Sequence, residues 1–475
     1  MTDQLNMSHH SSVADVSARP RFSLVLTLLA FAQLIISIDY NIVFVALPEI
    51  GLGLGFSAQT LQWVVSAYAV AFGGFLLLGG RASDLLGRRR MFVFGLVLYA
   101  VSSLVGGFAT TPQILIAARA VQGLGGAFLF PATLSLVNTT FSEGRERNIA
   151  LSVWAGSGAG GMVLGSLLGG VLTQAFGWEA VFFVNVPLAG IAIVAAFPVI
   201  LGDSGYQSGG KFDLPGALTA TVGTTLLVFT LVQGPEYGWA SQGILVSAAV
   251  GILLLALFVA IEAHSRDPLL PLRLLANRNL STGVVTTFLF TATFGSLLYF
   301  LSFYFQTVQG FGVLQTGFAF MVPMLAVLSG NALSGRMATR LGTRNTLVIS
   351  LAIGAIGTAA LGMAMSADST YADLVPGLIV FSLGGGITFP TMFAAAAKGV
   401  AAHEQGIASG IASTGQQVGS AVGLAILVAV ANAGTGGLTG EALRVATAEG
   451  VRMAVYLAAA GTAAMILVAL NFRRH

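Results

Sequence analysis

The chain has 475 residues, of which 56% are hydrophobic and only 8% are charged, and its formal net charge is +3. An ordinary soluble domain carries about 25% charged residues, so this composition excludes a soluble fold and indicates a polytopic membrane protein. The sequence contains no cysteine, which excludes disulfides, thiolate metal sites and thiol catalysis.

Apolar runs of about 20 residues, the length that a helix needs to cross the hydrocarbon core, recur along the whole chain. A β-barrel would show short alternating segments instead. The pattern predicts an all-α protein with fourteen transmembrane helices, preceded by a cytoplasmic tail at residues 1–21. The predicted helices span residues 22–48, 60–80, 91–108, 112–137, 149–175, 180–201, 214–234, 241–262, 279–306, 313–334, 345–366, 372–397, 405–430 and 451–471.

The distribution of Lys and Arg tests this topology. If both termini are cytoplasmic, the inner segments hold eighteen Lys and Arg residues, and the outer segments hold only Arg444 and Arg452. Cytoplasmic loops of membrane proteins carry such an excess of basic residues, and one missed or invented helix would scramble it downstream. We therefore expect a multi-pass protein of the cell membrane with both termini inside. The positive net charge reflects this topology and not affinity for nucleic acid.

Two local patterns occur twice. Residues 80–88 (GRASDLLGR) resemble residues 335–343 (GRMATRLGT), and residues 125–131 (GGAFLFP) resemble residues 384–390 (GGGITFP). Both pairs relate one predicted helix to the helix eight positions later. The simplest account is two six-helix halves with two inserted helices between them, the architecture of alternating-access carriers. The halves are predicted at 22–201 and 279–475, with the inserted helices and linkers at 202–278.

Several motifs carry a resemblance to a known family. The loop at residues 80–90 resembles the cytoplasmic signature of the major facilitator superfamily. Residues 38–48 resemble the first-helix signature of its fourteen-helix drug:proton antiporters, and residues 119–127 resemble their fourth-helix signature. Residues 178–187 resemble the entry to their sixth helix, although Glu179 stands where the family usually has Arg.

This resemblance implies the major facilitator fold and proton-coupled efflux of hydrophobic or cationic drugs and toxic small molecules by alternating access. It implies that the proton gradient drives transport and that no cofactor is needed. It also implies a monomer whose partners are drug-like molecules, protons and membrane lipid. The alternative is a dedicated exporter of a single metabolite or antibiotic with the same fold. An enzyme is disfavoured, because the sequence shows no phosphate loop, metal-ligand cluster or nucleophile constellation.

Only two of the Asp, Glu, Lys and Arg residues fall deep inside apolar stretches, Asp39 and Arg119. A charge near the bilayer centre costs about 2.5–3.5 kcal/mol on insertion scales, so both are functional candidates. Asp39 is predicted to carry the coupling proton or to meet a cationic substrate, and a hydrogen bond to a neighbouring helix or a wetted position is the alternative. Arg119 is predicted to be a fixed positive charge coupled to a carboxylate, or a group that holds backbone carbonyls in place.

The loop after the second helix supplies a candidate cytoplasmic gate. Its residues are Gly80, Asp84, Gly87, Arg88 and Arg89. Gly87 permits a tight turn, and Asp84 can meet basic residues or a helix N-terminus of a neighbouring span. A merely solvated basic loop is the alternative. The second copy has Thr339 in place of the acid, so a charge latch is expected to be stronger in the first half.

Two further groups of residues are candidates for transport. Gly161, Gly165 and Gly169 lie at four-residue spacing and predict close packing against another helix. They resemble the antiporter signature, with Ser166 in the place of its proline, and plain tight packing is the alternative. A soft aromatic lining on the central helices suits bulky amphipathic or cationic ligands, although each aromatic alone is better explained by lipid contact or packing. The predicted lining is Gln33, Tyr40, Gln122, Phe130, Phe288, Tyr299, Phe303, Tyr304, Phe389 and Phe393.

Overall fold

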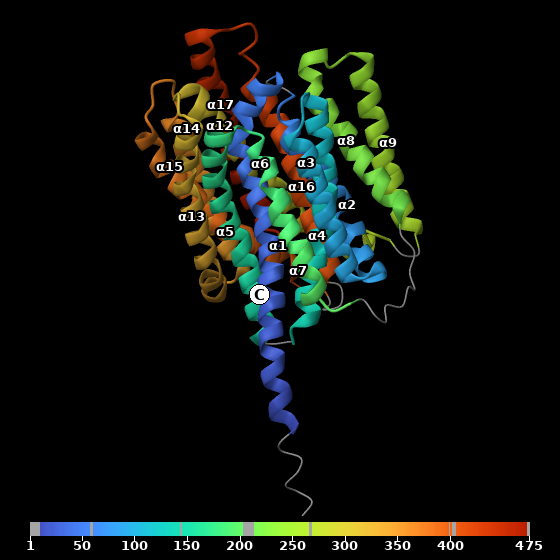
Figure 1. The fold of residues 1–475 in the computed structure, drawn as a ribbon. Helices are drawn as coiled ribbons and strands as arrows, with labels where there is room; N and C mark the ends of the chain where they lie inside the picture. The colour runs from blue at the N-terminus through green and yellow to red at the C-terminus, as the bar shows by residue number, and fades with distance from the viewer. Residues whose placement is uncertain are drawn as a thin grey trace, which may run out of the picture.

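The computed structural model describes residues 10–57, 60–142, 145–202, 213–265, 268–398, 400 and 405–472, and all regular elements in these ranges are helices (Figure 1). Thirteen helical segments of the described chain are long and apolar enough to cross a membrane. Helix α2 (Trp63–Leu86) has a shorter apolar stretch, Trp63–Leu76, and it packs inside the bundle against α4 and α16. It supplies the remaining predicted span, so the all-α polytopic fold is confirmed.

The first half follows the predicted spans closely. Its other helices are α1 (His10–Leu54), α3 (Arg88–Gly107), α4 (Pro112–Thr140), α5 (Arg145–Phe176), α6 (Ala180–Phe183) and α7 (Asn185–Val199). Residues 10–21, predicted as part of a polar tail, extend α1 as a helix beyond the bundle (Figure 1). The predicted single helix at 180–201 is divided into α6 and α7 at Val184.

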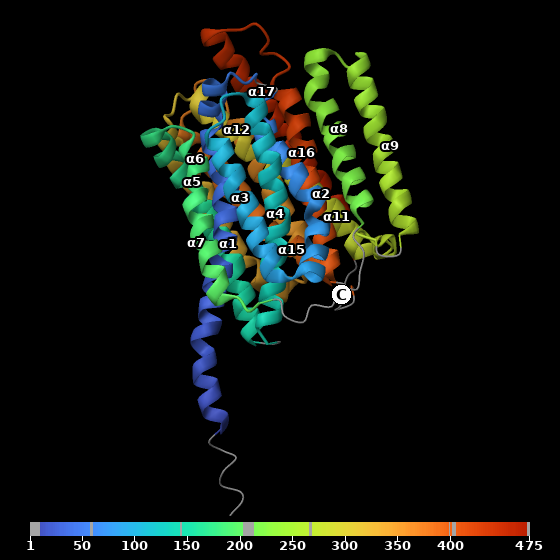
Figure 2. The ribbon, with the colours of Figure 1, turned by 45° about the vertical axis from the view of Figure 1, so that its right-hand side comes forward.

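The inserted pair, α8 (Leu214–Tyr237) and α9 (Gln242–His264), stands side by side at one edge of the bundle (Figure 1 and Figure 2). Asp213 caps α8, because its side chain accepts a hydrogen bond from the Gly216 amide at 2.8 Å. Helix α8 contacts α2 and α16. Only 11% of the apolar window of α9 is buried inside the protein, against 61% for α1, so α9 forms the outer rim.

The second half contains a span that is not one regular α-helix. The elements from residue 272 onwards are α10 (Leu272–Leu275), α11 (Arg278–Phe290), η1 (Thr291–Gly295), α12 (Leu297–Phe303), η2 (Tyr304–Val308), α13 (Val313–Leu341), α14 (Thr343–Ala364), α15 (Tyr371–Ala397), α16 (Gln405–Ala431) and α17 (Gly440–Ala469). The predicted helix at 279–306 therefore contains two π-helical turns, η1 and η2. At η1, the Ser296 hydroxyl donates to the Thr291 carbonyl five residues earlier, which helps to satisfy the altered backbone ladder.

Helix packing repeats between the halves. In the first half α1 packs against α5, and α4 packs against both α2 and α3. Eight spans later the same relations join α11 with α16, and α15 with α13 and α14. This repeated packing agrees with the repeat in the sequence. The boundaries 22–201, 202–278 and 279–475 stay a prediction.

The two ends of the bundle differ in how the halves meet. The N-terminal end of α1 and the end of α17 lie at one end, here named the basal end, and the opposite end is the distal end (Figure 1). One distal hydrophobic cluster joins both halves, with Leu47 and Val65 from the first and Phe305 and Leu427 from the second. Towards the basal end, the described residues of each half form clusters of their own. The halves are therefore packed together distally around a shared core.

Candidate functional site

The two charges predicted from the sequence meet in the first half. Arg119 Nη1 of α4 donates to Asp39 Oδ2 of α1 at 2.8 Å, and both side chains are buried. Arg119 Nε donates to the Val64 carbonyl of α2 at 2.9 Å. The guanidinium carbon also lies 4.5 Å from the centroid of the Tyr68 ring, within cation–π range. Arg119 thus both pairs with a carboxylate and holds a backbone carbonyl, the two roles predicted as alternatives.

The second Asp39 oxygen is also fully engaged. Oδ1 accepts from Gln122 Nε2 at 2.8 Å and from Asn185 Nδ2 at 2.7 Å. Gln122 Oε1 accepts from Arg119 Nη1 at 2.7 Å, and its Nε2 also donates to Ser103 Oγ at 2.7 Å. We name Asp39, Arg119, Gln122 and Asn185 the charge cluster. A buried ion pair is tolerated only when such additional hydrogen bonds satisfy its remaining lone pairs and protons.

Two members of the charge cluster were not placed there by sequence reasoning. Gln122 was predicted to line the substrate pocket, and the structure instead engages both ends of its amide beside Asp39. Asn185 was not selected, although it lies in the quoted motif at residues 178–187. It is fully buried and begins α7, which brings it to α1 across 146 positions of sequence.

The glycines of α5 pack against the backbone of α1, the helix that carries Asp39. A Cβ added at any of the three would lie closer than 3.0 Å to an α1 carbonyl oxygen, too close for real atoms. Glycine is therefore what allows the two backbones to approach. The added Cβ would lie 2.9 Å from Leu34 O at Gly161, 2.6 Å from Ile38 O at Gly165 and 2.8 Å from Ile42 O at Gly169.

Ser166 occupies the position of the proline in the antiporter signature and has a partner on α1. Asn41 Nδ2 donates to Ser166 Oγ at 2.8 Å and to the Met162 carbonyl at 2.6 Å. It also reaches Met324 Sδ of α13 at 3.5 Å. Residue 166 therefore links α1 to α5 through a hydrogen bond, next to a contact with the second half.

A matching glycine stripe lies on α16 and was missed by sequence reasoning. Gly415, Gly419 and Gly423 have the same four-residue spacing and face Val284, Phe288 and Ala292 in turn. At Gly419 a Cβ would collide with the Phe288 carbonyl, as one at Gly165 would with Ile38. Phe288, a predicted lining residue, thus contributes its backbone to helix packing. The spacing in the sequence was the available signal.

The loop at 80–90 forms the tight turn that was predicted. Gly87 separates α2 from α3 with a φ of 104°, a conformation that favours glycine, and Gly342 separates α13 from α14 with a φ of 79°. Arg89 donates to the Ile200 carbonyl at 3.4 Å and lies over the Phe197 ring, at the end of α7.

The remaining gate residues are placed as follows. Gly80 faces Pro131 of α4, and Arg88 begins α3. Asp84 lies in the last turns of α2, and its side chain lies outside the described residues. In the second copy, the Thr339 hydroxyl donates to Gly335 of its own helix at 2.8 Å.

The predicted aromatic lining falls into separate groups. In the first half, Phe130 contacts Trp154 at 5.3 Å between ring centroids, while Tyr40 pairs with Phe44 at 5.5 Å. Gln33 is buried next to Gly158. In the second half, the rings of Phe389 and Phe393 lie 5.5 Å apart, and those of Tyr299 and Phe303 lie 5.0 Å apart.

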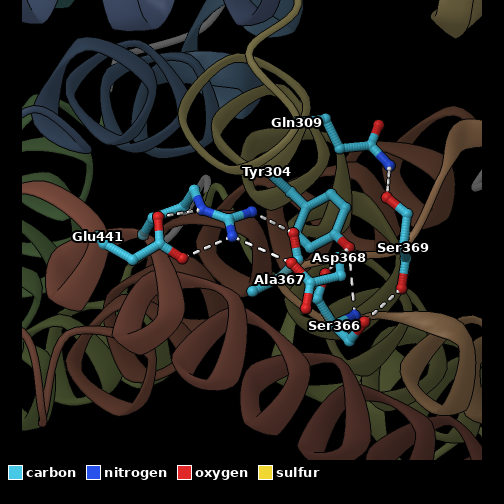
Figure 3. Close-up of polar contacts among 8 residues, drawn as sticks. Tyr304, Gln309, Ser366, Ala367, Asp368, Ser369 and Glu441 are labelled. Atoms are coloured by element: carbon cyan, nitrogen blue, oxygen red, sulfur yellow. Dashed lines mark hydrogen bonds and ion pairs between the residues drawn. The ribbon is translucent and has the colours of Figure 1, made fainter.

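Tyr304 belongs to a polar clamp at the distal end of the second half (Figure 3). Its hydroxyl donates to the Ser366 carbonyl at 2.6 Å, and Gln309 Nε2 donates to the Ser369 carbonyl at 3.0 Å. These bonds fix η2 to the loop between α14 and α15. Arg444 of α17 holds the same loop through Asp368 at 3.1 Å. The structure therefore places Tyr304 in the distal cluster, apart from Phe393, which packs with Phe290 in a basal cluster of the second half. Phe389 meets the same Phe290 ring with centroids 6.2 Å apart.

The protein consists of two packed halves, each with six spans in a repeated arrangement, and one half holds a buried charge cluster. This is the architecture of a secondary transporter. Among the residues that the structure describes, no three His, Cys, Asp or Glu side chains gather as metal ligands. The sequence profile of the Major Facilitator Superfamily matches residues 29–424, and the chain belongs to this family.

Similar proteins were found by sequence and by structure. The cephamycin export protein of Amycolatopsis lactamdurans is 35% identical over 449 residues, covering 94% of this chain and 92% of that protein. The puromycin resistance protein of Streptomyces alboniger is 35% identical over 418 residues, covering 86% and 82%. The crystal structure of the POT family transporter PepTSo has a TM-score of 0.67 at 15% identity and covers 95% of this chain and 97% of that one. The last likeness shows the fold alone.

Proposed function

We propose that this protein exports small drug-like molecules from the cell in exchange for protons, by alternating access of its two halves. Family membership supports a transporter, and the two relatives whose names refer to antibiotic export and resistance support efflux. The observation that carries the coupling is the buried Asp39–Arg119 pair. The proton gradient is the energy source in this proposal, and no cofactor takes part.

Asp39 is the proposed proton carrier. Protonation removes the negative charge that Arg119, Gln122 and Asn185 all face, and a buried cation without its counterion is strongly unfavourable. The protonated state therefore favours a different arrangement of α1, α4 and α7, and loss of the proton restores the one described here. A ligand can shift such an equilibrium only through different affinity for the two states, and the proton meets this condition at Asp39.

Helix α1 connects the charge cluster to the other half. One face of α1 carries Asp39, and another face packs against the glycine stripe of α5. Helix α5 in turn packs on α13, where a Cβ at Gly170 would lie 3.1 Å from Leu314 Cα. A movement of α1 that follows protonation is therefore transmitted through closely packed backbones, which interdigitate and do not deform freely.

We further propose that the basal end is cytoplasmic and that the protein acts as a monomer surrounded by lipid. The eighteen Lys and Arg residues of the predicted inner segments support this orientation. With this orientation, the shared distal core closes the outer side. The halves form separate clusters at the basal end, so the described arrangement is the inward-facing state of the carrier.

The test is transport by purified protein in liposomes with an imposed pH gradient, with cationic dyes and neutral antibiotics as substrates. Asp39→Asn keeps the shape of the side chain but cannot exchange a proton, so gradient-driven transport is expected to be lost while insertion is retained. Glu49→Gln, on the same helix, is the matched control and is expected to transport normally. Undiminished gradient-driven efflux by Asp39→Asn would contradict the proposal.

A dedicated exporter of one compound is the second candidate, and the cephamycin export protein among the relatives favours it. The same substrate panel separates the two. Transport of several unrelated compounds supports a multidrug exporter. Transport of one chemical type alone supports the dedicated exporter.

A further inference from the structure

A continuous series of aromatic rings leads from the charge cluster towards the basal side of the first half. Tyr68, over which Arg119 lies, is stacked with Phe72 at 5.8 Å between ring centroids. Phe72 meets Phe130 of α4 edge-on at 6.0 Å, and Phe130 meets Trp154 of α5 at 5.3 Å. Tyr68 and Phe72 are buried, whereas Phe130 and Trp154 are only partly buried. The series therefore ends in an apolar surface made of two partly exposed rings, which are tilted by 57° to each other.

Trp154 and the neighbouring Gln33 each carry a buried polar atom that has no hydrogen-bond partner among the described residues. The two atoms are Gln33 Oε1, an acceptor, and Trp154 Nε1, a donor. The Gln33 side chain is only 9% exposed. A Cβ at Gly158, one helical turn from Trp154 on α5, would lie 3.0 Å from Gln33 Nε2, so Gln33 lies against the same part of α5. Buried polar groups are normally paired, and the lack of partners on both indicates that something else supplies them.

The chemistry of the surface selects the partner. One acceptor and one donor beside aromatic rings match a planar group that carries both an N–H and a C=O. Asp39 does not supply a negative charge to such a ligand, because it is fully buried and both of its oxygens accept hydrogen bonds within the charge cluster. The surface therefore suits a neutral ligand better than an organic cation.

We propose that Gln33, Phe130 and Trp154 form a binding surface for planar neutral ligands of the lactam or secondary-amide class. The ligand N–H donates to Gln33 Oε1, Trp154 Nε1 donates to the ligand carbonyl, and the ring of the ligand packs against Phe130. Phe130 and Gln33 were expected to line a pocket, but Trp154 and the preference for a neutral amide follow from the structure. The inference rests on the proposed function only in taking this ligand to be a transported molecule.

The test is equilibrium binding to the purified full chain without a pH gradient, with 2-quinolinone and its N-methyl derivative as probes. Both carry the ring and the carbonyl, and only 2-quinolinone carries the N–H. The unmodified protein is expected to bind 2-quinolinone about tenfold more tightly, the effect of one well-placed hydrogen bond in a buried site. Calorimetry or competition with a bound dye measures the two affinities.

Two variants separate the contribution of the Gln33 acceptor from that of the Trp154 donor. Gln33→Leu removes the acceptor, so the preference for 2-quinolinone over its N-methyl derivative is expected to disappear. Trp154→Phe keeps an aromatic ring but removes the donor, so both probes are expected to bind about tenfold more weakly while the preference remains. Trp239→Phe, at an exposed tryptophan between α8 and α9, is the control and should change neither affinity.

Three results would overturn the inference: equal affinity for the two probes, a preference that survives Gln33→Leu, or no saturable binding of 2-quinolinone. The binding pattern is measured without a gradient and therefore does not depend on proton coupling. If Asp39→Asn transports normally but the probe pattern holds, proton coupling at Asp39 fails and the binding surface stands. If the pattern fails while Asp39→Asn loses transport, only the binding surface is wrong.

Discussion

The two halves of this protein fill equivalent positions with opposite chemistry. In the repeat that aligns residues 125–131 with 384–390, the positions of Arg119 and Gln122 in α4 correspond to Leu378 and Phe381 in α15. Leu378 and Phe381 are buried, as are Arg119 and Gln122. Phe381 stacks on Phe294 of η1 with ring centroids 4.1 Å apart. The first half thus holds an ion pair where the second half holds packed apolar side chains.

The fold therefore does not depend on the two buried charges. Both halves bring their helices together through glycine stripes at four-residue spacing, on α5 and on α16. The same helix packing therefore accepts either a satisfied polar cluster or an apolar core. A buried ion pair contributes little net stability compared with well-packed apolar residues, so its presence at this position of the first half points to function.

The contrast between the halves is tested most strongly by placing a residue of the second half at the equivalent position of the first. Arg119→Leu reproduces Leu378 but leaves Asp39 buried without its cation, so we expect a loss of about 3–5 kcal/mol in the free energy of unfolding. Asp39→Asn combined with Arg119→Leu removes the uncompensated charge and should recover part of that loss. Unfolding of the purified protein in detergent measures both variants.

A conservative change in the second half serves as the control for that experiment. Leu378→Met nearly conserves side-chain volume, so its cost is expected to stay below about 1.5 kcal/mol. If Arg119→Leu were no more costly than Leu378→Met, Asp39 would not depend on Arg119 to compensate its buried charge, and the contrast between the halves would be lost.

The close helix packing at the glycine stripes is the feature that the two halves share. Gly165→Ala and Gly419→Ala each place a methyl group against a facing carbonyl oxygen, so each is expected to cost about 1–3 kcal/mol through overpacking. Gly156→Ala, also on α5, has nothing within 4 Å of its added Cβ. It should be neutral or slightly stabilising, because alanine favours helices. Thermal unfolding of the three variants makes the comparison, and equal stabilities would refute it.

The smallest expected effect concerns the distal clamp of the second half. Tyr304→Phe removes the hydroxyl that bonds Ser366 and should cost about 1 kcal/mol, the usual net value of such a bond. Tyr237→Phe, at an exposed position at the end of α8, is the control and should stay within about 0.5 kcal/mol of the unmodified protein. The midpoint of thermal unfolding reports the difference. A loss at Tyr237 as large as that at Tyr304 would show that the clamp adds no stability.

Several features followed from the sequence because they depend on local pattern. Hydropathy placed the spans, the asymmetry of Lys and Arg indicated their orientation, and the recurrence of two short motifs indicated the repeat. Asp39 and Arg119 stood out because charges are rare in apolar runs. The positive φ at Gly87 agrees with the turn predicted there. Each of these inferences needs only neighbouring residues and the properties of the bilayer.

The partners of those residues were decided by the tertiary structure. Asn185 reaches Asp39 across 146 positions, and Arg119 reaches it across 80, so no periodicity in the sequence pairs them. Gln122 was expected to line a pocket, and the packing of α4 against α1 instead brings its amide to Asp39. Trp154 of α5 meets Phe130 of α4 with ring centroids 5.3 Å apart, a contact between two helices that no local pattern pairs. Composition determined which groups the membrane must bury, and close packing of distant helices determined which of them satisfy one another.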